Sequence, residues 1–188
     1  IDYGTLAEAE RLTVQWQTRD PQRLAPLWTR FRMYCQARNF AAAGACLDKI
    51  EALRPEHPGV PYERSAIKQE TWDLNEAERL AREALAARPD QFSYLSNLLG
   101  IQLKAGKFDE FDTLLQRMNH MLGDRRYSSY PSLFFNINCH PDWSSAAIAD
   151  FYRTWNEQVI LPQHRETVRH ANRPEPERRL RIGYVSPD

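Results

Sequence analysis

Apolar side chains recur along most of the chain at the three- and four-residue spacing of an amphipathic helix, which predicts a helical protein. The pattern itself repeats with a step of 34 residues, and prolines, alanines and larger apolar residues each keep that step. When the chain is aligned on this 34-residue step, four columns of equivalent residues run through four periods. These columns predict a stack of repeats. The columns are Pro21, Pro55, Pro89 and Gly123; Ala9, Ala43, Ala77 and Phe111; Leu6, Phe40, Leu74 and Phe108; and Trp16, Ile50, Ala84 and Met118.

Each column has a physical role in a unit made of two helices. The alanines let the two helices approach closely, and the larger residue three positions earlier fills the gap where the second helix starts. A proline just after the second helix ends it, because proline cannot continue a helix. Gly106 can take a left-handed turn between the helices at low cost. A 34-residue helix–turn–helix unit of this kind is typical of the tetratricopeptide (TPR) repeat.

The phase of the pattern predicts how the repeats divide the chain. Residues 1–125 are expected to hold the second helix of one repeat, over 1–20, and then three full repeats near 24–57, 58–91 and 92–125. The chain is therefore expected to begin inside a repeat. Three repeats are about the minimum for an independent stack.

After residue 125 the period lapses, and residues 126–160 are interpreted as a helical adaptor. Residues 130–138 are apolar enough for one helix, and Ser144 is a candidate N-cap for another that runs to about Val159. The second helix carries an aromatic stripe, which favours a packing face that docks the repeats onto the next domain. Residues 161–178 are polar and contain three prolines, which indicates a linker. Glutamates interleave with the linker arginines, which favours a solvated linker over a phosphate-binding arm.

Composition argues against several classes of function. The 25 Lys and Arg residues balance 25 Asp and Glu residues, so the net charge is zero, and the basic face of a nucleic-acid binder is not expected. No apolar run is long enough to cross a membrane. The three cysteines and five histidines form no metal-binding or catalytic motif, so no metal, cofactor or catalytic residue is expected in this segment. Free cysteines and the lack of a signal peptide indicate a cytoplasmic location.

A TPR stack curves so that the first helix of each repeat lines its concave face. Planar, cationic and amide side chains fall on that face, and such groups can hydrogen-bond an extended peptide backbone. The alternative is that they are merely exposed polar residues. The candidate contacts with an acceptor protein or peptide are Trp28, Arg32, Tyr62, Gln69, Asn97 and Lys104.

The last ten residues, Arg179 to Asp188, read as a buried strand that runs into a turn and not as a helix. The string LRIGYVSPD resembles the first strand of the catalytic domain of bacterial O-GlcNAc transferase-like glycosyltransferases. Repeats that pass through a helical adaptor into this strand are also similar to that family. The expected fold is thus an all-α TPR superhelix and adaptor that ends, over 179–188, in the first strand of a GT-B Rossmann-like domain.

The resemblance implies a transferase that moves a sugar from a UDP donor, in the first place UDP-GlcNAc, to Ser or Thr of acceptor proteins. It also implies that the catalytic and donor-binding residues lie outside this segment, which alone is expected to be inactive. Animal members of the family grip substrate with a ladder of asparagines. Only Asn97 matches that ladder here, and Thr29 and Glu63 occupy the equivalent positions. The alternative is a stand-alone TPR adaptor that binds a partner protein or forms a homodimer.

Overall fold

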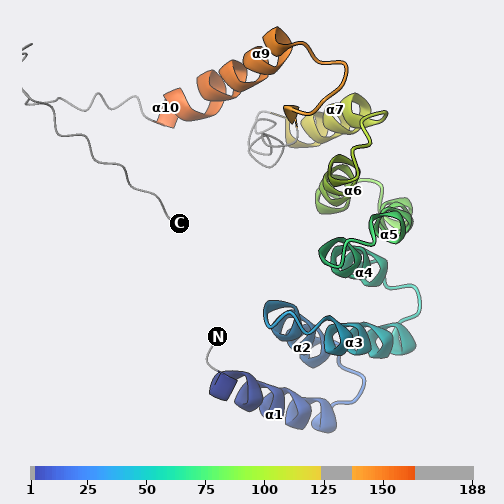
Figure 1. Cartoon of the computed structure of the whole chain (residues 1–188). Coiled ribbons are helices and arrows are strands. Elements are labelled where there is room, and N and C mark those ends of the chain that lie inside the picture. The colour runs from blue at the N-terminus through green and yellow to red at the C-terminus, as the bar shows by residue number, and fades with distance from the viewer. Residues whose placement is uncertain (1–2, 124–136, 164–188) are drawn as a thin grey trace, which may run out of the picture.

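The computed structural model describes residues 3–123 and 137–163, and the regular elements in these ranges are all helical. They stack in chain order, and α1 and α9 lie on the same side of the middle helices, so the stack is curved (Figure 1). The helices are α1 (Tyr3–Arg19), α2 (Ala25–Gln36), α3 (Phe40–Leu53), α4 (Gly59–Glu70), α5 (Leu74–Ala87), α6 (Phe92–Lys104), α7 (Phe111–Leu122), α9 (Ser145–Trp155), the π-helical turn η2 (Asn156–Ile160) and α10 (Leu161–Gln163).

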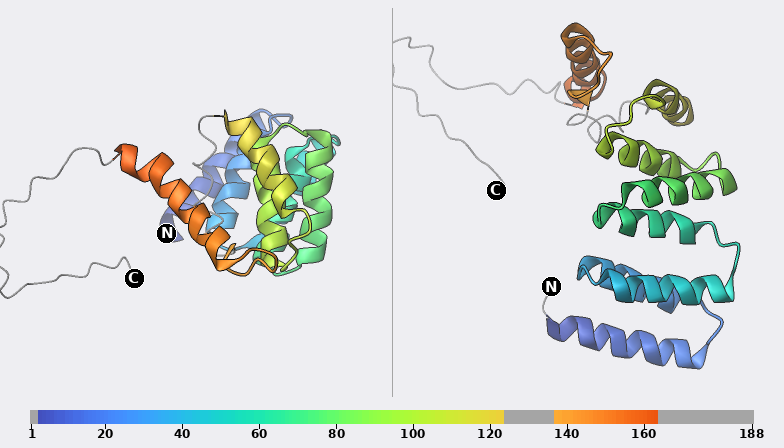
Figure 2. Two further views of the ribbon diagram at one scale, coloured as in Figure 1. Left: turned by 90° about the horizontal axis from the view of Figure 1, so that it is seen from above. Right: turned by 45° about the vertical axis from the view of Figure 1, so that its right-hand side comes forward.

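Helices α2 to α7 form three antiparallel pairs, α2 with α3, α4 with α5, and α6 with α7, with α1 packed beneath α2. Figure 2 shows these helices as successive layers along one axis, with α9 beyond α7. The expected all-helical, TPR-like stack is therefore present in the described residues. The predicted linker beyond Gln163 and the predicted strand over 179–188 lie outside them, as does most of the helix predicted over 130–138.

All three first helices end in the same left-handed turn. Arg38, Trp72 and Gly106 have φ of 54°, 60° and 69°, and they are 34 positions apart. In each turn the next N–H donates to the carbonyl five residues earlier, as in a Schellman motif. These bonds are Asn39 to Tyr34 at 2.8 Å, Asp73 to Lys68 at 2.9 Å and Lys107 to Gln102 at 2.9 Å. Only Gly106 was expected to adopt this conformation, and two residues with side chains adopt it too.

The second helix of the third repeat begins later than the register predicts. By register it should start near Phe108, but α7 starts at Phe111. Phe108 instead packs against the core, with its ring 4.9 Å from the ring of His140. Glu110 in the same loop accepts hydrogen bonds from Arg82 and Gln102, both at 3.1 Å. These contacts stabilise a longer loop before α7. In the other two repeats the second helix begins directly after the left-handed turn.

The apolar interior consists of two separate clusters of buried side chains. The first lies between α2 and α3 and includes Val60 of α4, and the second extends from α5 through α7 to Ile137 and Phe151. Helix α4 contacts both, because Val60 is buried in the first cluster and Tyr62 packs against the second. The small residue Ala77 is 0% exposed, as close approach of paired helices requires.

Helix α9 begins at the predicted cap, where the Ser144 hydroxyl accepts a hydrogen bond from the Ala147 N–H at 3.2 Å. Its aromatic stripe packs at least in part on the repeats. Phe151 is buried in the cluster of the last two repeats, and Trp143 contacts the Phe111 ring edge to face at 5.5 Å. The helix continues as η2 and α10 through Pro162 to Gln163, so the first residues of the predicted linker are helical.

A buried carboxylate bridges the second and third repeats. Glu78 is 9% exposed and accepts hydrogen bonds from Lys107 at 2.6 Å, Arg82 at 2.8 Å and Gln102 at 3.3 Å. Burial raises the pKa of the Glu78 carboxyl, but hydrogen bonds from these three side chains outweigh it, and its pKa lies below the ordinary value. The ionised form of Glu78 therefore stabilises this boundary.

We predict that Glu78→Gln lowers the free energy of unfolding at neutral pH by about 2 kcal/mol, as for hydrogen bonds to a charged group. Because the folded-state pKa lies below its unfolded value, the stabilisation is present above that value and is lost as the pH falls through the folded-state pKa. Thermal melts between about pH 5 and pH 3 should fall less steeply for Glu78→Gln than for the wild type. Glu83→Gln, on the exposed face of α5, is the matched control and should keep the wild-type slope. Equal slopes for Glu78→Gln and the wild type would contradict this assignment.

Candidate peptide-binding groove

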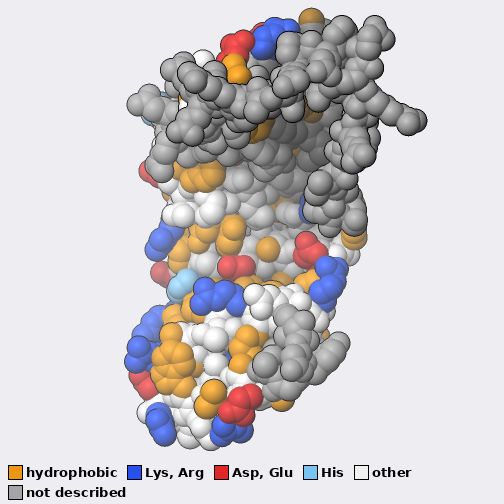
Figure 3. Space-filling view, turned by 90° about the vertical axis from the view of Figure 1, so that its left-hand side faces the viewer, with side chains coloured by type: hydrophobic (Ala, Val, Ile, Leu, Met, Phe, Trp, Pro, Cys, Tyr) orange, Lys and Arg blue, Asp and Glu red, His pale blue; other side chains and the backbone are white. Residues whose placement is uncertain are grey.

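Two adjoining hollows lie between α2 and α4, with volumes of about 470 Å³ and about 350 Å³. Both are lined by Phe31, Arg32 and Glu63, so they form one continuous groove. We call it the inner groove, and it runs from Trp28 and Tyr62 at one end to Glu70 at the other. Figure 3 looks onto the side toward which the stack curves, where charged side chains of both signs lie among hydrophobic ones. The groove thus combines apolar walls with charge.

One end of the inner groove is aromatic. The Trp28 ring lies 5.7 Å from Phe31, edge to face, and 5.4 Å from His57. Tyr62 stacks on Tyr94 of α6 with ring centroids 4.6 Å apart. Tyr94 therefore brings the third repeat into a site that otherwise belongs to the first two. Such rings offer flat apolar area with little conformational entropy to lose on binding.

The start of α4 approaches this aromatic end closely because residue 59 is glycine. A Cβ at Gly59 would lie 2.9 Å from the His57 ring and 3.5 Å from the Trp28 ring. The Gly59 N–H donates to Nδ1 of His57 at 3.1 Å, so a neutral His57 carries its proton on Nε2. The missing Cβ thus leaves room for the His57 ring, and the backbone N–H of residue 59 sets the tautomer of that ring.

The centre of the inner groove holds a carboxylate that no described residue binds. Glu63 is partly buried and has neither a hydrogen bond nor an ion pair to any residue that the structure describes. Burial raises the pKa of the Glu63 carboxyl, and the more distant Arg32 guanidinium lowers it without cancelling the rise. Arg32 is exposed at the groove edge and likewise has no ion-pair partner among the described residues. A desolvated carboxylate beside an available guanidinium is typical of a binding site.

Cys35 also lines the groove but is not a nucleophile. Burial, together with the nearby charges of Glu63 and Cys46, raises the pKa of the Cys35 thiol to about 11. The thiol stays protonated at neutral pH and behaves as a small apolar side chain.

The six residues predicted to contact a peptide fall into two groups. Trp28, Arg32 and Tyr62 all line the aromatic end of the inner groove. The other three lie farther along the stack, where they hydrogen-bond to one another and to Ser65. Lys104 donates to Gln69 Oε1, Gln69 Nε2 donates to Asn97 Oδ1 at 3.4 Å, and Asn97 Nδ2 donates to Ser65 Oγ at 2.6 Å. This second group bridges α4 and α6 in the structure.

Among the groove residues that sequence reasoning missed as contacts are His57, Glu63 and Tyr94. Glu63 was noticed only because it stands where an asparagine ladder would continue. It shares the register of Thr29 and Asn97, and this was the signal that could have identified it. Tyr94 does not share the register of Tyr62 and reaches it only through the crossing of α4 and α6.

Other kinds of site are not found in the described residues. No group of three or more His, Cys, Asp or Glu side chains there could hold a metal ion. No helix among the described residues is both long enough and apolar enough to cross a bilayer.

Comparisons with known proteins concern the fold. Neither a family model nor a curated protein matches the chain. A crystal structure of MamA protein is similar with a TM-score of 0.65 and 13% identity, over 87% of this chain and 88% of that one. The MamA RS-1 ArsTM double mutant gives 0.65 and 17%, over 87% and 90% of the two chains. MamA 41-end from Desulfovibrio magneticus RS-1 gives 0.60 and 16%, over 88% and 90%. At these identities the likeness shows a shared helical-repeat fold alone.

The charge at the centre of the groove gives a prediction for NMR. We expect the pKa of the Glu63 carboxyl to lie above the ordinary value for glutamate, because the group is partly buried. Arg32→Gln should raise its pKa further, because the guanidinium favours the ionised form. Arg38→Gln is the control in the same groove and should leave the Glu63 pKa unchanged, since Arg38 pairs with Glu70. A Glu63 pKa that falls or stays constant in Arg32→Gln would show that Arg32 does not act on this carboxylate.

Proposed function

We propose that the repeats bind an extended segment of a partner protein in the inner groove. The observation that supports this most directly is the Glu63 carboxylate, which is desolvated without a hydrogen bond to any described residue. Partial burial of such a group costs free energy, and no hydrogen bond from a described residue offsets that cost. A bound peptide would offset it by donating hydrogen bonds to the Glu63 carboxylate.

The walls of the groove define the kind of segment that fits. The rings of Trp28 and Tyr62 suit an apolar or aromatic side chain of the ligand, and Glu63 suits a basic side chain or a backbone N–H. Arg32, exposed at the edge, can donate to backbone carbonyls. The proposed ligand is thus an extended peptide with an apolar residue next to a basic one.

Selection from a random dodecapeptide library tests this proposal. Wild-type protein should enrich peptides that pair an apolar residue with Lys or Arg. Trp28→Ala should weaken their binding by about tenfold or more, because a central aromatic anchor is lost. Glu63→Gln should bind the same peptides but lose the preference for a basic residue.

Glu83→Gln, on the exposed face of α5, removes the same charge outside the groove and serves as the control. It should bind like the wild type. Enriched peptides that bind wild type, Trp28→Ala and Glu63→Gln equally well would show that the inner groove is not the binding site.

We further propose that the groove presents acceptor protein to a GT-B glycosyltransferase domain that uses a UDP-sugar, with UDP-GlcNAc the first candidate. This rests on the resemblance of the last ten residues to the first catalytic strand of O-GlcNAc transferase-like enzymes. The rival proposal is a stand-alone TPR adaptor that binds a partner protein or forms a homodimer, without a catalytic domain after Asp188.

The two proposals differ in how far the coding sequence should continue. Both predict that residues 1–188 alone have no transferase activity. Under the transferase proposal, coding sequence should continue past Asp188 for roughly 300 to 400 residues, the size of two Rossmann-like lobes. It should place a histidine a few positions beyond that aspartate. Purified residues 1–188 should release no UDP from UDP-GlcNAc in the presence of acceptor protein. A stop codon after Asp188 would support the adaptor, and turnover by the fragment would contradict our placement of the chemistry.

A further inference from the structure

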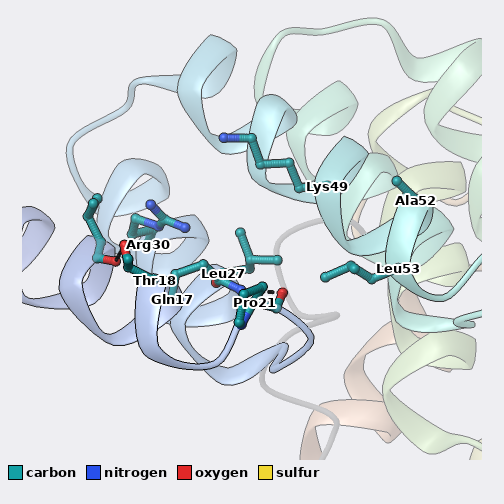
Figure 4. Close-up of a pocket in the computed structure, with 9 residues that line it drawn as sticks. Gln17, Thr18, Pro21, Leu27, Arg30, Lys49, Ala52 and Leu53 are labelled. Atoms are coloured by element: carbon teal, nitrogen blue, oxygen red, sulfur yellow. Dashed lines mark hydrogen bonds between the residues drawn. The ribbon is translucent and has the colours of Figure 1, made fainter.

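A separate cavity of about 530 Å³ lies between α1, α2 and α3, within the range of roughly 300–1,000 Å³ that is typical of small-molecule sites. We call it the outer pocket; its aliphatic wall includes Val14, Leu27 and Leu53, and its polar groups include Gln17, Arg30 and Lys49. In Figure 4 the charged ends of Arg30 and Lys49 lie toward one side of the pocket, and Pro21 and Leu53 lie toward the other.

The outer pocket is independent of the inner groove although both use α2. Arg30 lines the outer pocket, whereas Arg32 lines the inner groove. Two positions along a helix correspond to a rotation of about 200°, so the two arginines leave α2 on nearly opposite sides. Binding in one cavity therefore requires no contact with the other.

Arg30 is the unusual residue of the outer pocket. It is 9% exposed, its Nε is buried without a hydrogen-bond partner, and the described residues offer it no ion pair. None of the described residues that line the pocket is acidic, and Lys49 adds a second positive charge. Glu10 on α1 forms no ion pair with Arg30; its carboxylate accepts a hydrogen bond from the Tyr34 hydroxyl at 2.6 Å instead. A buried guanidinium nitrogen without a partner is costly, and an anion bound to the guanidinium would offset that cost.

The same pocket contains a buried acceptor with no donor. Nε2 of Gln17 donates to the carbonyl of Pro21 at 2.8 Å and to that of Arg23 at 3.1 Å. This fixes the orientation of the amide, because the opposite one would turn its oxygen toward those carbonyls. Oε1 of Gln17 is buried and has no hydrogen-bond partner among the described residues. The outer pocket therefore offers cationic donors and an aliphatic wall, and the Gln17 amide is held in place beside them.

We propose that the outer pocket binds a carboxylate that carries an aliphatic side chain. Arg30 and Lys49 bind the carboxylate, whose two oxygens match the planar fork of a guanidinium. The aliphatic group packs on Val14 and Leu53. This chemistry occurs in N-acylated branched amino acids and in the last residue of a peptide, and the experiment distinguishes these two sources.

Calorimetric titration of residues 1–188 tests the proposal with two probes, N-acetyl-leucine and a hexapeptide that ends in leucine. Each probe is compared with its C-terminal amide, which lacks the negative charge. We expect at least one free acid to bind and its amide to bind about tenfold more weakly or not at all. Binding of both acids shows that a small molecule suffices, and binding of the peptide alone assigns the site to the C-terminus of a polypeptide.

Variants locate the site. Arg30→Met keeps an unbranched apolar stem without the charge, and it should lose about tenfold or more in affinity. Arg32→Met, on the opposite side of the same helix, is the matched control and should bind the acid like the wild type. Because Arg30 is buried without a partner among the described residues, Arg30→Met should also have a melting temperature equal to or above that of the unliganded wild type, which separates lost binding from lost folding.

Two further measurements keep the test independent of that variant. Lys49→Gln should weaken binding, and the side-chain amide signals of Gln17 should shift when the acid is added to the wild type. The proposal is overturned if neither free acid binds, if the amides bind as well as the acids, or if Arg30→Met and Lys49→Gln both bind like the wild type.

Discussion

The two hydrophobic clusters of the stack are separate, and α4 joins them. Val60 is buried in the cluster of the first repeat, whereas Tyr62 packs on the cluster of the later repeats. Arg64, also on α4, forms ion pairs with Asp48 and Glu51 of α3, both at 2.8 Å. These ion pairs are substantially exposed and contribute little, so the apolar contacts of α4 hold the repeats together.

The two boundaries of α4 differ in how their polar groups are used, and this difference creates the inner groove. Toward the third repeat, Asn97 hydrogen-bonds to Ser65, so its amide is occupied within the stack. Toward the first repeat, Glu63 holds the equivalent register position but has no such bond among the described residues. One position of the repeat therefore supplies a structural bridge at one boundary and an available charge at the other.

The period of the sequence was enough to predict the helical pairs, because it reflects the repeated need for small or apolar residues at fixed contacts. It could not predict burial at the ends of the stack. Trp16 shares a column with Ile50, yet Trp16 is 38% exposed and Ile50 is 0% exposed. The repeat register predicts that Trp28 and Tyr62 lie on the same surface, and both line the inner groove. It did not reveal that Lys104 is occupied by Gln69, since that depends on how two helices cross.

Helix α2 is a shared wall, since the outer pocket and the inner groove are built on its two sides. Neighbouring residues of α2 serve different cavities, since Leu27 and Arg30 line the outer pocket whereas Trp28 and Arg32 line the inner groove. A substitution at one of these positions therefore alters the lining of one cavity and leaves the lining of the other unchanged.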